Sequence, residues 1–406
     1  MKNKECISPR YEKNFTLDAD IQIHSNANKK DSSFSIKESA DKSKLLLFES
    51  NVSNVFTDNS YKITIFDINL NILWDKEFGG KDVSIHKEHF YTASIKIGND
   101  GSVYMTGRKY LGKKHTEDKK AFNGYSIKRI YKDEKIKSYD LPFEESIVYR
   151  LGGKFSLVQN NENDNLKLVV LQMKSNGKLF YHFEIVELTQ QLELVNKNII
   201  KPTKENFLEL TEKQKKNKNW VEDSQKEVVM RKVKILPNND LVIVTENGSP
   251  STFTTSKFTG NAVTDAKSRS IFVYKFNEEN QLSWIREIPK NQSGTDYNVG
   301  FVWKVYDKNQ FFVFNDTEKN YLNKESRVPK YNGSFLSNNI LKAVRLNNDT
   351  GDMEESIVFK LDDEQIWAYL SSGYGANNYL NISHENLLFM GNKKKKFKLI
   401  NLNFKN

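Results

Sequence analysis

The sequence predicts an all-β protein, a six-bladed β-propeller of four-stranded blades, and three observations carry this prediction. Short runs in which apolar and polar residues alternate recur along the chain, for example around residues 61–67 and 241–244. A tight polar turn between two strands recurs six times. Only residues 203–227 have a helical pattern, which predicts one short helical insertion near 203–220. Many short strands with so little helix are typical of a sandwich, a barrel or a propeller.

The turn repeat favours the propeller. Its copies are marked by residues 42, 101, 164, 239, 309 and 385, with gaps of 59, 63, 75, 70 and 76 residues. A second hairpin follows each turn and is clearest at 61–78, 125–141 and 270–288. Two hairpins make four strands, which is one blade, so six copies predict six blades. Unrelated β-meanders, for instance in two sandwich domains, are the alternative.

The expected blades form a single domain over residues 1–406, with approximate bounds 32–80, 89–143, 146–200, 228–290, 301–360 and 365–406. The helical insertion, 203–227, precedes the fourth blade. The sixth copy ends at its third strand, 396–404, which would leave an unpaired edge. Residues 11–24 offer a fourth strand, because apolar residues alternate with polar ones in 14–23. We expect residues 14–23 to pair with 396–404 and close the ring.

The composition excludes several classes of protein. Of the 406 residues, 37% are hydrophobic and 12% aromatic, enough to fill a core, so global disorder is excluded. The single cysteine, Cys6, excludes a disulfide framework, a thiolate zinc site and an iron–sulfur cluster. No run approaches about 18 apolar residues, so we expect no membrane span. The chain starts without the apolar stretch of a signal peptide, and its net charge of +10 predicts only weak attraction to anions.

The long insertions predict where a ligand would bind. Residues 109–124, 245–269 and 315–338 lie between second and third strands, and 203–227 and 290–300 connect blades. In a propeller all these connections share one rim, and loops carry function more often than the scaffold does. Surface insertions without a function are the alternative.

Two sets of residues on this rim are candidates for ligand binding. The first set is polar and lies at strand ends of the fourth and fifth blades: Glu246, Lys290, Gln292, Asn315 and Asp316. In the absence of a ligand, Lys290 would pair with Glu246 or Asp316, and the alternative role of the set is to brace loops. The second set is aromatic and lies in insertions 245–269 and 315–338, which we expect to fold over the first set: Phe253, Phe258, Tyr321, Tyr331 and Phe335.

No motif indicates catalysis, a cofactor or a metal. The sequence has no G-x-S-x-G, H-E-x-x-H or P-loop motif. His86 and His89 are three residues apart beside a strand, which is more typical of a solvated turn than of a metal site. The four lysines 393–396 are typical of a solubilising hairpin, and neighbouring aromatics alternate toward the core, so we expect no nucleic-acid binding.

Residues 228–318 resemble a known family. A strand ending at Glu246, a loop rich in Ser, Thr and Phe, and the series Trp284-Ile-Arg-Glu-Ile-Pro-Lys-Asn-Gln292 precede Phe311-Phe-Val-Phe-Asn-Asp316. This series is similar to an uncharacterised propeller-type family of Bacteroidota. The resemblance implies an exported protein, periplasmic or on the cell surface, and implies no activity.

Three functions are consistent with these features. The first is a non-enzymatic binding scaffold for an unknown protein or glycan ligand, monomeric and without a cofactor. The second is a glycan-processing enzyme, a lyase or hydrolase, with its site at the channel mouth. The third is a surface-structural protein without a small ligand.

Overall fold

The structure is a computed structural model of the whole chain. It describes residues 32–51, 59–83, 88–111, 122–141, 155–160, 162–174, 179–221, 228–255, 262–290, 292–294, 300–322, 331–332, 339–360, 367–368, 379–381, 386–393 and 396–403. The chain separates into two compact units, Met1–Leu141 and Pro142–Asn406. None of the described helices is both long and apolar enough to cross a membrane.

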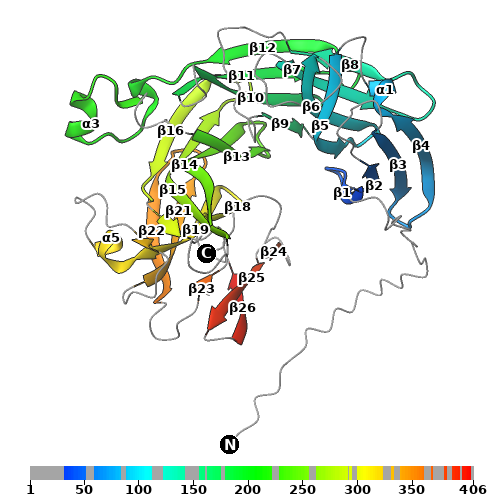
Figure 1. The fold of residues 1–406 in the computed structure, drawn as a ribbon. Coiled ribbons are helices and arrows are strands. Elements are labelled where there is room, and N and C mark those ends of the chain that lie inside the picture. The colour runs from blue at the N-terminus through cyan, green and yellow to red at the C-terminus, as the bar shows by residue number, and fades with distance from the viewer. Residues whose placement is uncertain are drawn as a thin grey trace, which may run out of the picture. The chain divides into compact units, whose positions relative to one another are not determined.

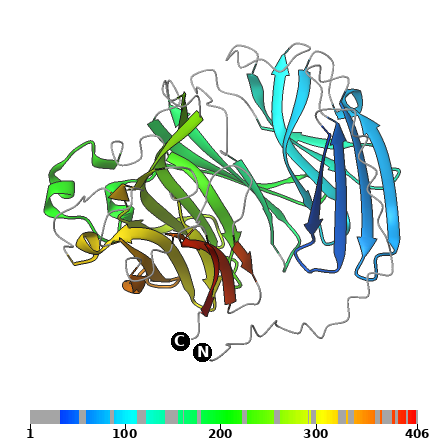
Figure 2. The ribbon, with the colours of Figure 1, turned by 60° about the horizontal axis from the view of Figure 1, so that its bottom comes forward.

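The first unit holds two four-stranded antiparallel sheets, each a simple meander (Figures 1 and 2). Sheet one consists of β1 (Ser32–Glu38), β2 (Lys44–Asn51), β3 (Ser60–Asp67) and β4 (Ile72–Gly79). Sheet two consists of β5 (Glu88–Ile97), β6 (Val103–Leu111), β7 (Phe122–Ile130) and β8 (Lys137–Asp140). The short helix α1 (Gly80–Val83) follows β4, and one apolar core, with Ile63, Ile65, Val103 and Met105 among its fully buried members, joins the two sheets.

The second unit holds the remaining described sheets. Sheet three is β9 (Phe155–Gln159), β10 (Leu166–Lys174), β11 (Leu179–Leu188) and β12 (Leu194–Ile200). Sheet four has β13 (Val228–Ile235), β14 (Leu241–Thr255), β15 (Ala262–Phe276) and β16 (Leu282–Ile288), with β17 (Gln292–Gly294) and β20 (Tyr331–Asn332) attached. Sheet five is β18 (Val302–Tyr306), β19 (Asn309–Thr317), β21 (Asn339–Asn347) and β22 (Met353–Lys360). Sheet six is β23 (Trp367–Ala368), β24 (Tyr379–Asn381), β25 (Asn386–Lys393) and β26 (Lys396–Asn403).

Sheet four lies between sheets three and five, and its sequence explains why. Along β14, Leu241 and Ile243 pack into a core shared with β10 and β11 of sheet three. The alternate residues Val242 and Val244 pack into a core shared with β19 and β21 of sheet five. Because successive side chains of a strand point to opposite faces, this continuous apolar run is buried on both sides. The prediction that apolar and polar residues alternate around 241–244 was therefore wrong.

The repeated turns share one backbone conformation. A left-handed residue (positive φ) occupies the turn between the first two strands in sheets one to five, at Lys42, Gly101, Asp164, Asn239 and Asp307. A second left-handed residue occupies the turn between the third and fourth strands of the same sheets, at Leu70, Lys132, Leu192, Asn280 and Gly351. Four of the sequence markers coincide with such residues, and the fifth is displaced from 309 to 307. Marker 385 lies outside the described residues.

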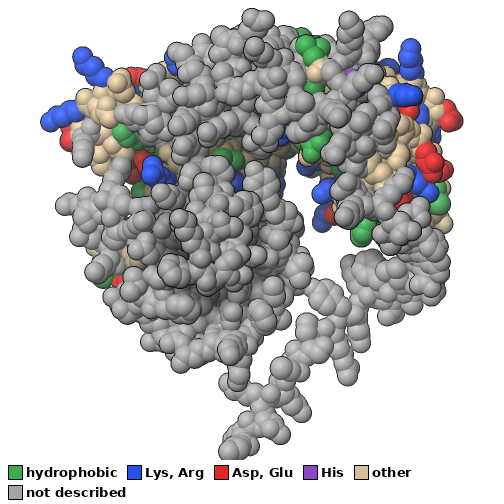
Figure 3. All heavy atoms as spheres, viewed as in Figure 1, with side chains coloured by type: hydrophobic (Ala, Val, Ile, Leu, Met, Phe, Trp, Pro, Cys, Tyr) green, Lys and Arg blue, Asp and Glu red, His purple; other side chains and the backbone are tan. Residues whose placement is uncertain are grey.

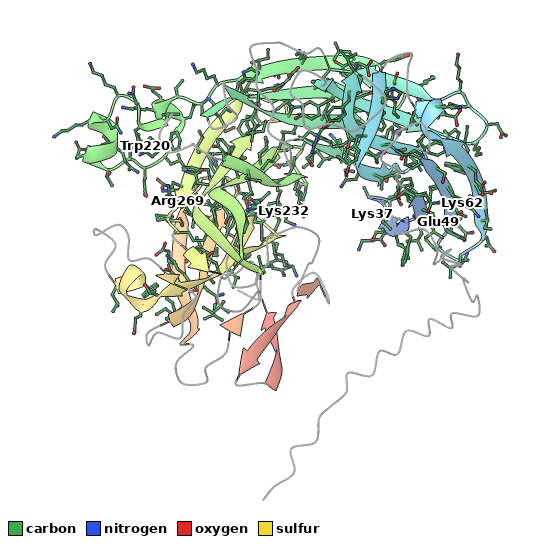
Figure 4. The ribbon with its side chains drawn as sticks, viewed as in Figure 1. Lys37, Glu49, Lys62, Trp220, Lys232 and Arg269 are labelled. Carbon is green, nitrogen blue, oxygen red and sulfur yellow. The ribbon has the colours of Figure 1, made fainter. Side chains whose placement is uncertain are left out.

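In its described part, the predicted helical insertion contains a 3₁₀ turn, η2 (Lys204–Asn206), the short helix α3 (Glu212–Lys216) and the helical residues Trp220 and Val221. Residues 222–227 lie outside the described part. Phe207 forms a bridge with Ile285 of β16 and packs edge-on against Trp220, with ring centroids 4.7 Å apart. The insertion is therefore fastened to the edge strand of sheet four, and Figure 4 shows Trp220 beyond β16. The prediction of helix only in this region was wrong, because α1 and α5 (Glu318–Leu322) are also helical.

Sheet six is three strands wide in its described part. Both β23 and β24 pair with β25, and β26 pairs with β25 along its whole length. Among the described residues, β26 has no second neighbour. The predicted closing strand, residues 14–23, lies outside the described residues, so ring closure stays a prediction.

Candidate functional site

An extended hairpin distinguishes sheet four from the other described sheets. Strands β14 and β15 have 15 residues each, whereas the second and third strands of sheets one, two, three and five have eight to ten. Beyond residue 247 the two strands continue to pair through Thr255 and Ala262. The predicted insertion 245–269 is thus largely a β-hairpin. Its tip, 256–261, lies outside the described residues.

Two further segments join this hairpin. Strand β17 pairs antiparallel with residues 266–268 of β15, and β20 pairs parallel with β17. The segments come from the predicted insertions 245–269, 290–300 and 315–338. The structure therefore brings these three together in one small sheet. We call it the hairpin extension: residues 248–255 and 262–268 with β17 and β20.

A buried carboxylate lies where the hairpin extension begins. Glu246 is fully buried on β14 and accepts hydrogen bonds from Arg231 Nε at 2.7 Å and from Lys290 Nζ. Arg231 Nη2 lies 2.7 Å from the same carboxylate oxygen, Oε2. Arg231 reaches this position because the pairing of β13 with β14 shifts register between Met230 and Lys232, a β-bulge of the kind that redirects a side chain.

A second carboxylate extends this group of charges into sheet five. Lys342 Nζ lies 3.7 Å from Asp316 Oδ2 and 2.9 Å from Glu355 Oε1. Both lysines lie near the ring of Phe314, whose centroid is 5.9 Å from Lys290 Nζ and 5.6 Å from Lys342 Nζ. Asp316 also acts electrostatically on Lys290. We call these residues the ion cluster: Arg231, Glu246, Lys290, Asp316, Lys342 and Glu355.

The ion cluster is balanced in charge, with three cations and three carboxylates. Complete burial lowers the pKa of Lys290. The negative charges of Glu246 and Asp316 oppose this shift, whereas the positive charge of Arg231 reinforces it. A buried charge is tolerated only when it is paired and hydrogen-bonded. Its pairing therefore makes the cluster a brace between sheets four and five.

The side-chain amide of Gln292 completes the brace. Gln292 of β17 donates a hydrogen bond through Nε2 to the backbone carbonyl oxygen of Asn315, at 2.6 Å. The Gln292 side-chain oxygen accepts a hydrogen bond from the backbone N–H of Gly300, at 2.8 Å. This pair of bonds ties β17 to the end of β19, and so ties the hairpin extension to sheet five.

The structure brings together the polar residues that the sequence singled out. Glu246, Lys290, Gln292, Asn315 and Asp316 are all buried, with exposed fractions of 0 to 5%. Buried in this way, they bind one another and support the hairpin extension from below. Their contribution to ligand binding stays a prediction.

The aromatic candidates are only partly described. Phe253 lies on β14 opposite Thr264, and Tyr331 lies on β20 opposite Gln292. Tyr321 lies half-buried on α5, next to Leu322, whose side chain is 72% exposed. Phe258 and Phe335 lie outside the described residues.

Three members of the ion cluster were not foreseen. Lys342 interrupts the apolar run 340–344, and such a lone charge inside a strand is a signal for a buried partner. Arg231 and Lys232 break the alternation of β13, which is a signal for the bulge. Glu355 lies in the polar stretch Glu354-Glu355-Ser356 of β22, so nothing in the sequence distinguished it from its neighbours.

Other candidate chemistry is not supported by the described residues. No group of three or more His, Cys, Asp or Glu side chains in the described ranges could hold a metal ion. His89 is 6% exposed on β5, so the interpretation of this histidine as part of a solvated turn was wrong. His86 lies outside the described residues.

The comparisons with known proteins give no family. No protein-family model matches the chain, and no curated protein matches it. An ulvan lyase of a polysaccharide lyase family aligns over 92% of this chain and 79% of its own, at 10% identity and a TM-score of 0.39. The NanB sialidase of Streptococcus pneumoniae covers 93% of this chain and 60% of its own, at 9% identity and a TM-score of 0.33. The β-propeller domain of the Trilobed protease of Pyrococcus furiosus covers 93% and 97%, at 9% identity and a TM-score of 0.30. Likenesses this distant carry no argument about activity.

Proposed function

We propose that the chain is a propeller-type binding scaffold whose recognition surface is the hairpin extension with the neighbouring helix α5. The observation that carries the proposal is the length of β14 and β15 and their pairing with β17 and β20. The four-stranded meander of sheet four is complete without these segments. Ordered structure beyond what the sheet requires, fixed by a buried ion cluster, is typical of a binding surface held on a rigid scaffold.

The six-bladed ring is part of this proposal. Sheets one and two share a core, and sheet four shares one core with sheet three and another with sheet five, as consecutive blades do. Residues 14–23 would supply the missing fourth strand of sheet six. Deleting residues 1–24 tests this: we expect lower thermal stability and faster amide exchange over 396–403. Unchanged exchange in that segment would contradict the closure.

A glycan is the ligand that suits this surface best. The end of β14, Gly248-Ser-Pro-Ser-Thr-Phe-Thr-Thr255, is rich in hydroxyl side chains with an aromatic among them, and α5 adds Tyr321 and the exposed Leu322. Hydroxyl groups can hydrogen-bond to sugar hydroxyls, and aromatic rings cover the apolar faces of sugars.

Export of the protein to the periplasm or the cell surface is also part of the proposal. It rests on the family resemblance alone, and cell fractionation tests it.

A panel of purified polysaccharides tests the proposal. Neutral, uronate-containing and sulfated polymers are titrated against the full chain and against a variant in which residues 249–267 are replaced by Asn-Gly. Because Gly248 and Ser268 are paired partners, the shortened hairpin keeps the register of sheet four. We expect at least one polymer to bind the full chain and to lose at least tenfold in affinity with the variant. Equal binding by both proteins would refute the recognition surface.

The same experiment examines the enzymatic alternative. A glycan-processing enzyme needs a carboxylate that can exchange a proton, whereas Glu246 is held by two cations and Asp316 by Lys342. We therefore place binding first. Release of reducing ends or unsaturated products from a bound polymer would instead support the lyase or hydrolase. Phe253→Ala and Tyr331→Ala should weaken binding, unlike changes in the turn at Lys42.

A further inference from the structure

A group of buried polar side chains lies on sheet three, apart from the ion cluster and the hairpin extension. Gln172 of β10 lies directly opposite His182 of β11, and Glu184 lies two residues further along β11. Successive side chains of a strand point to opposite faces, and the neighbouring residues Leu171 and Phe183 pack into the core shared with sheet four. Gln172, His182 and Glu184 therefore share the other face, where each is at most 7% exposed.

A β-bulge lies at this point of sheet three. The register of β10 and β11 shifts between Gln172, which pairs with His182, and Met173, which pairs with Phe180. Tyr181 is thus the extra residue of β11. Bulges redirect side chains and are frequent next to functional sites. The shift makes Gln172 and His182 the last regular pair before the bulge.

The orientation of the Gln172 amide is fixed by its neighbour. Its Nε2 donates a hydrogen bond to Glu184 Oε2 at 3.1 Å. A carboxylate only accepts hydrogen bonds, so the amide nitrogen must face Glu184 and the amide oxygen must face away from it. That oxygen is buried and accepts no hydrogen bond from any residue in the described ranges. Because a buried acceptor without a donor is costly, this orientation favours a ligand group that donates to it.

The ion pair beside this amide is reversed relative to those of other sheets. Lys197 Nζ of β12 lies 2.6 Å from Glu184 Oε1, so the carboxylate is on the third strand and the cation on the fourth. In sheets one, two and five the cation lies on the second or third strand and the carboxylate on the fourth, in the pairs Lys62–Glu77, Lys109–Asp140, Lys342–Glu355 and Arg345–Glu354. Sheet three thus carries acceptor oxygens on its inner strands.

The margin of this polar group is open to solvent. Strand β12 is an edge strand of sheet three (Figure 1). Its residue Ile199 pairs with Glu184 and is 59% exposed, and the side chain of Lys197 is 33% exposed. The acceptor oxygens therefore border an exposed apolar side chain. A sugar has the matching combination, because hydroxyl donors surround a ring whose faces carry C–H groups.

The charges around the site favour a neutral ligand. Lys197 offsets the charge of Glu184. Figure 3 shows Lys and Arg side chains interspersed with Asp and Glu on the described surface, so neither sign of charge dominates the face in view. We propose that Gln172 and Glu184, with His182 beside them, bind the hydroxyl groups of a neutral sugar. The site uses no residue of the hairpin extension and therefore does not depend on the proposed function.

Calorimetric titration with small neutral sugars tests the site. The probes are glucose, galactose, mannose, xylose and N-acetylglucosamine. The proteins are the full chain, Gln172→Leu, which removes the acceptor at similar volume, and Glu184→Gln. The control is Glu187→Gln, because Glu187 also lies on β11 but faces the opposite side of the sheet and accepts a hydrogen bond from Asn165 at 2.9 Å.

We expect at least one sugar to bind the full chain and the control alike, and to bind Gln172→Leu and Glu184→Gln at least tenfold more weakly. Urea unfolding should show that Gln172→Leu stays folded, since the substitution conserves volume. A second readout does not depend on a variant's affinity. The side-chain amide signals of Gln172, assigned by their absence from the spectrum of Gln172→Leu, should shift in nuclear magnetic resonance spectra of the full chain when the sugar is added.

Three results would overturn the proposal: no binding of any probe to the full chain, equal binding by all the variants, or binding that leaves the Gln172 amide signals unmoved. The variant with the shortened hairpin should bind the sugar as tightly as the full chain does. The site on sheet three and the recognition surface can therefore fail separately.

Discussion

Removal of the central carboxylate of the ion cluster should destabilise the protein far more than removal of its lysine partner. In Glu246→Gln, Lys290 and Arg231 lose their shared counter-charge, and the side chain of Lys290 is 0% exposed. Leaving a buried charge uncompensated costs about 3–5 kcal/mol. In Lys290→Met, by contrast, Glu246 keeps Arg231, and the desolvated ammonium is replaced by an apolar chain of similar length. We expect a loss of about 1 kcal/mol or less for this variant.

The double variant decides whether the two residues act as a pair. Glu246→Gln/Lys290→Met should be more stable than Glu246→Gln alone, because the buried cation has gone together with its partner. The coupling energy expected for contacting charges is about 2 kcal/mol, inside the range seen for directly interacting residues. Urea unfolding followed by tryptophan fluorescence measures each variant, and an unchanged m-value shows that the denatured state is the same.

The control for this cycle is an exposed pair. Arg345 and Glu354 lie 2.8 Å apart, with side chains 42% and 71% exposed, so Glu354→Gln should change stability by about 0.5 kcal/mol or less. A Glu246→Gln variant within about 1 kcal/mol of wild type would refute the brace. A double variant whose loss of stability equals the sum of the losses in the two single variants would also refute the brace.

Three further predictions concern the scaffold and its charges. Gly107→Ala should destabilise the protein by about 3 kcal/mol in urea unfolding, because a Cβ there would collide with the Tyr91 carbonyl oxygen and the Phe90 ring; a loss below about 1 kcal/mol would argue against this β5–β6 contact. Gly101→Ala should cost about 1 kcal/mol from its φ of 87°, while Lys42→Gly at the equivalent turn should be neutral or stabilising, as thermal unfolding can measure; a stabilising Gly101→Ala or a destabilising Lys42→Gly would contradict the shared left-handed turn. Lys234→Gln should stabilise the protein by about 0.5 kcal/mol or less at pH 7. Burial lowers the native pKa of Lys234 below its ordinary value of 10.5. The stability of the wild type therefore rises with pH between the native pKa and 10.5, and the advantage of the variant should disappear near pH 10.5. An advantage independent of pH would contradict the burial of this amine.

The sheets were predictable because their signals are local. Strand alternation and the turns at Lys42, Gly101 and Asn239 depend on residues a few positions apart, and the structure gives each of these turns a left-handed residue. The meeting of Glu246 with Lys290 was expected because both stand at strand ends of one blade. The ion cluster was harder to foresee. Lys342 and Glu355 enter it through pairing between β21 and β22, and Arg231 enters through a bulge, neither of which a single strand reveals.

The length of the β14–β15 hairpin was not predicted, because it too depends on pairing between strands. Residues 248–255 and 262–268 contain Gly, Pro, Asp and several Ser and Thr, a composition typical of loops. They pair because the two strands already run in register from Leu241 and Phe276 and because β17 covers residues 266–268 of β15. Pairing over such a distance outweighs local propensity.

Amide hydrogen exchange with a bound polysaccharide tests the central claim most directly. The polymer that binds most tightly in the panel is added to the full chain, and exchange is compared with and without it. We expect new protection over 248–255, 262–268, 292–294 and 331–332, with little change at the turns around Lys42, Gly101 and Asn239. Protection concentrated at those turns, with the hairpin extension unchanged, would contradict the account.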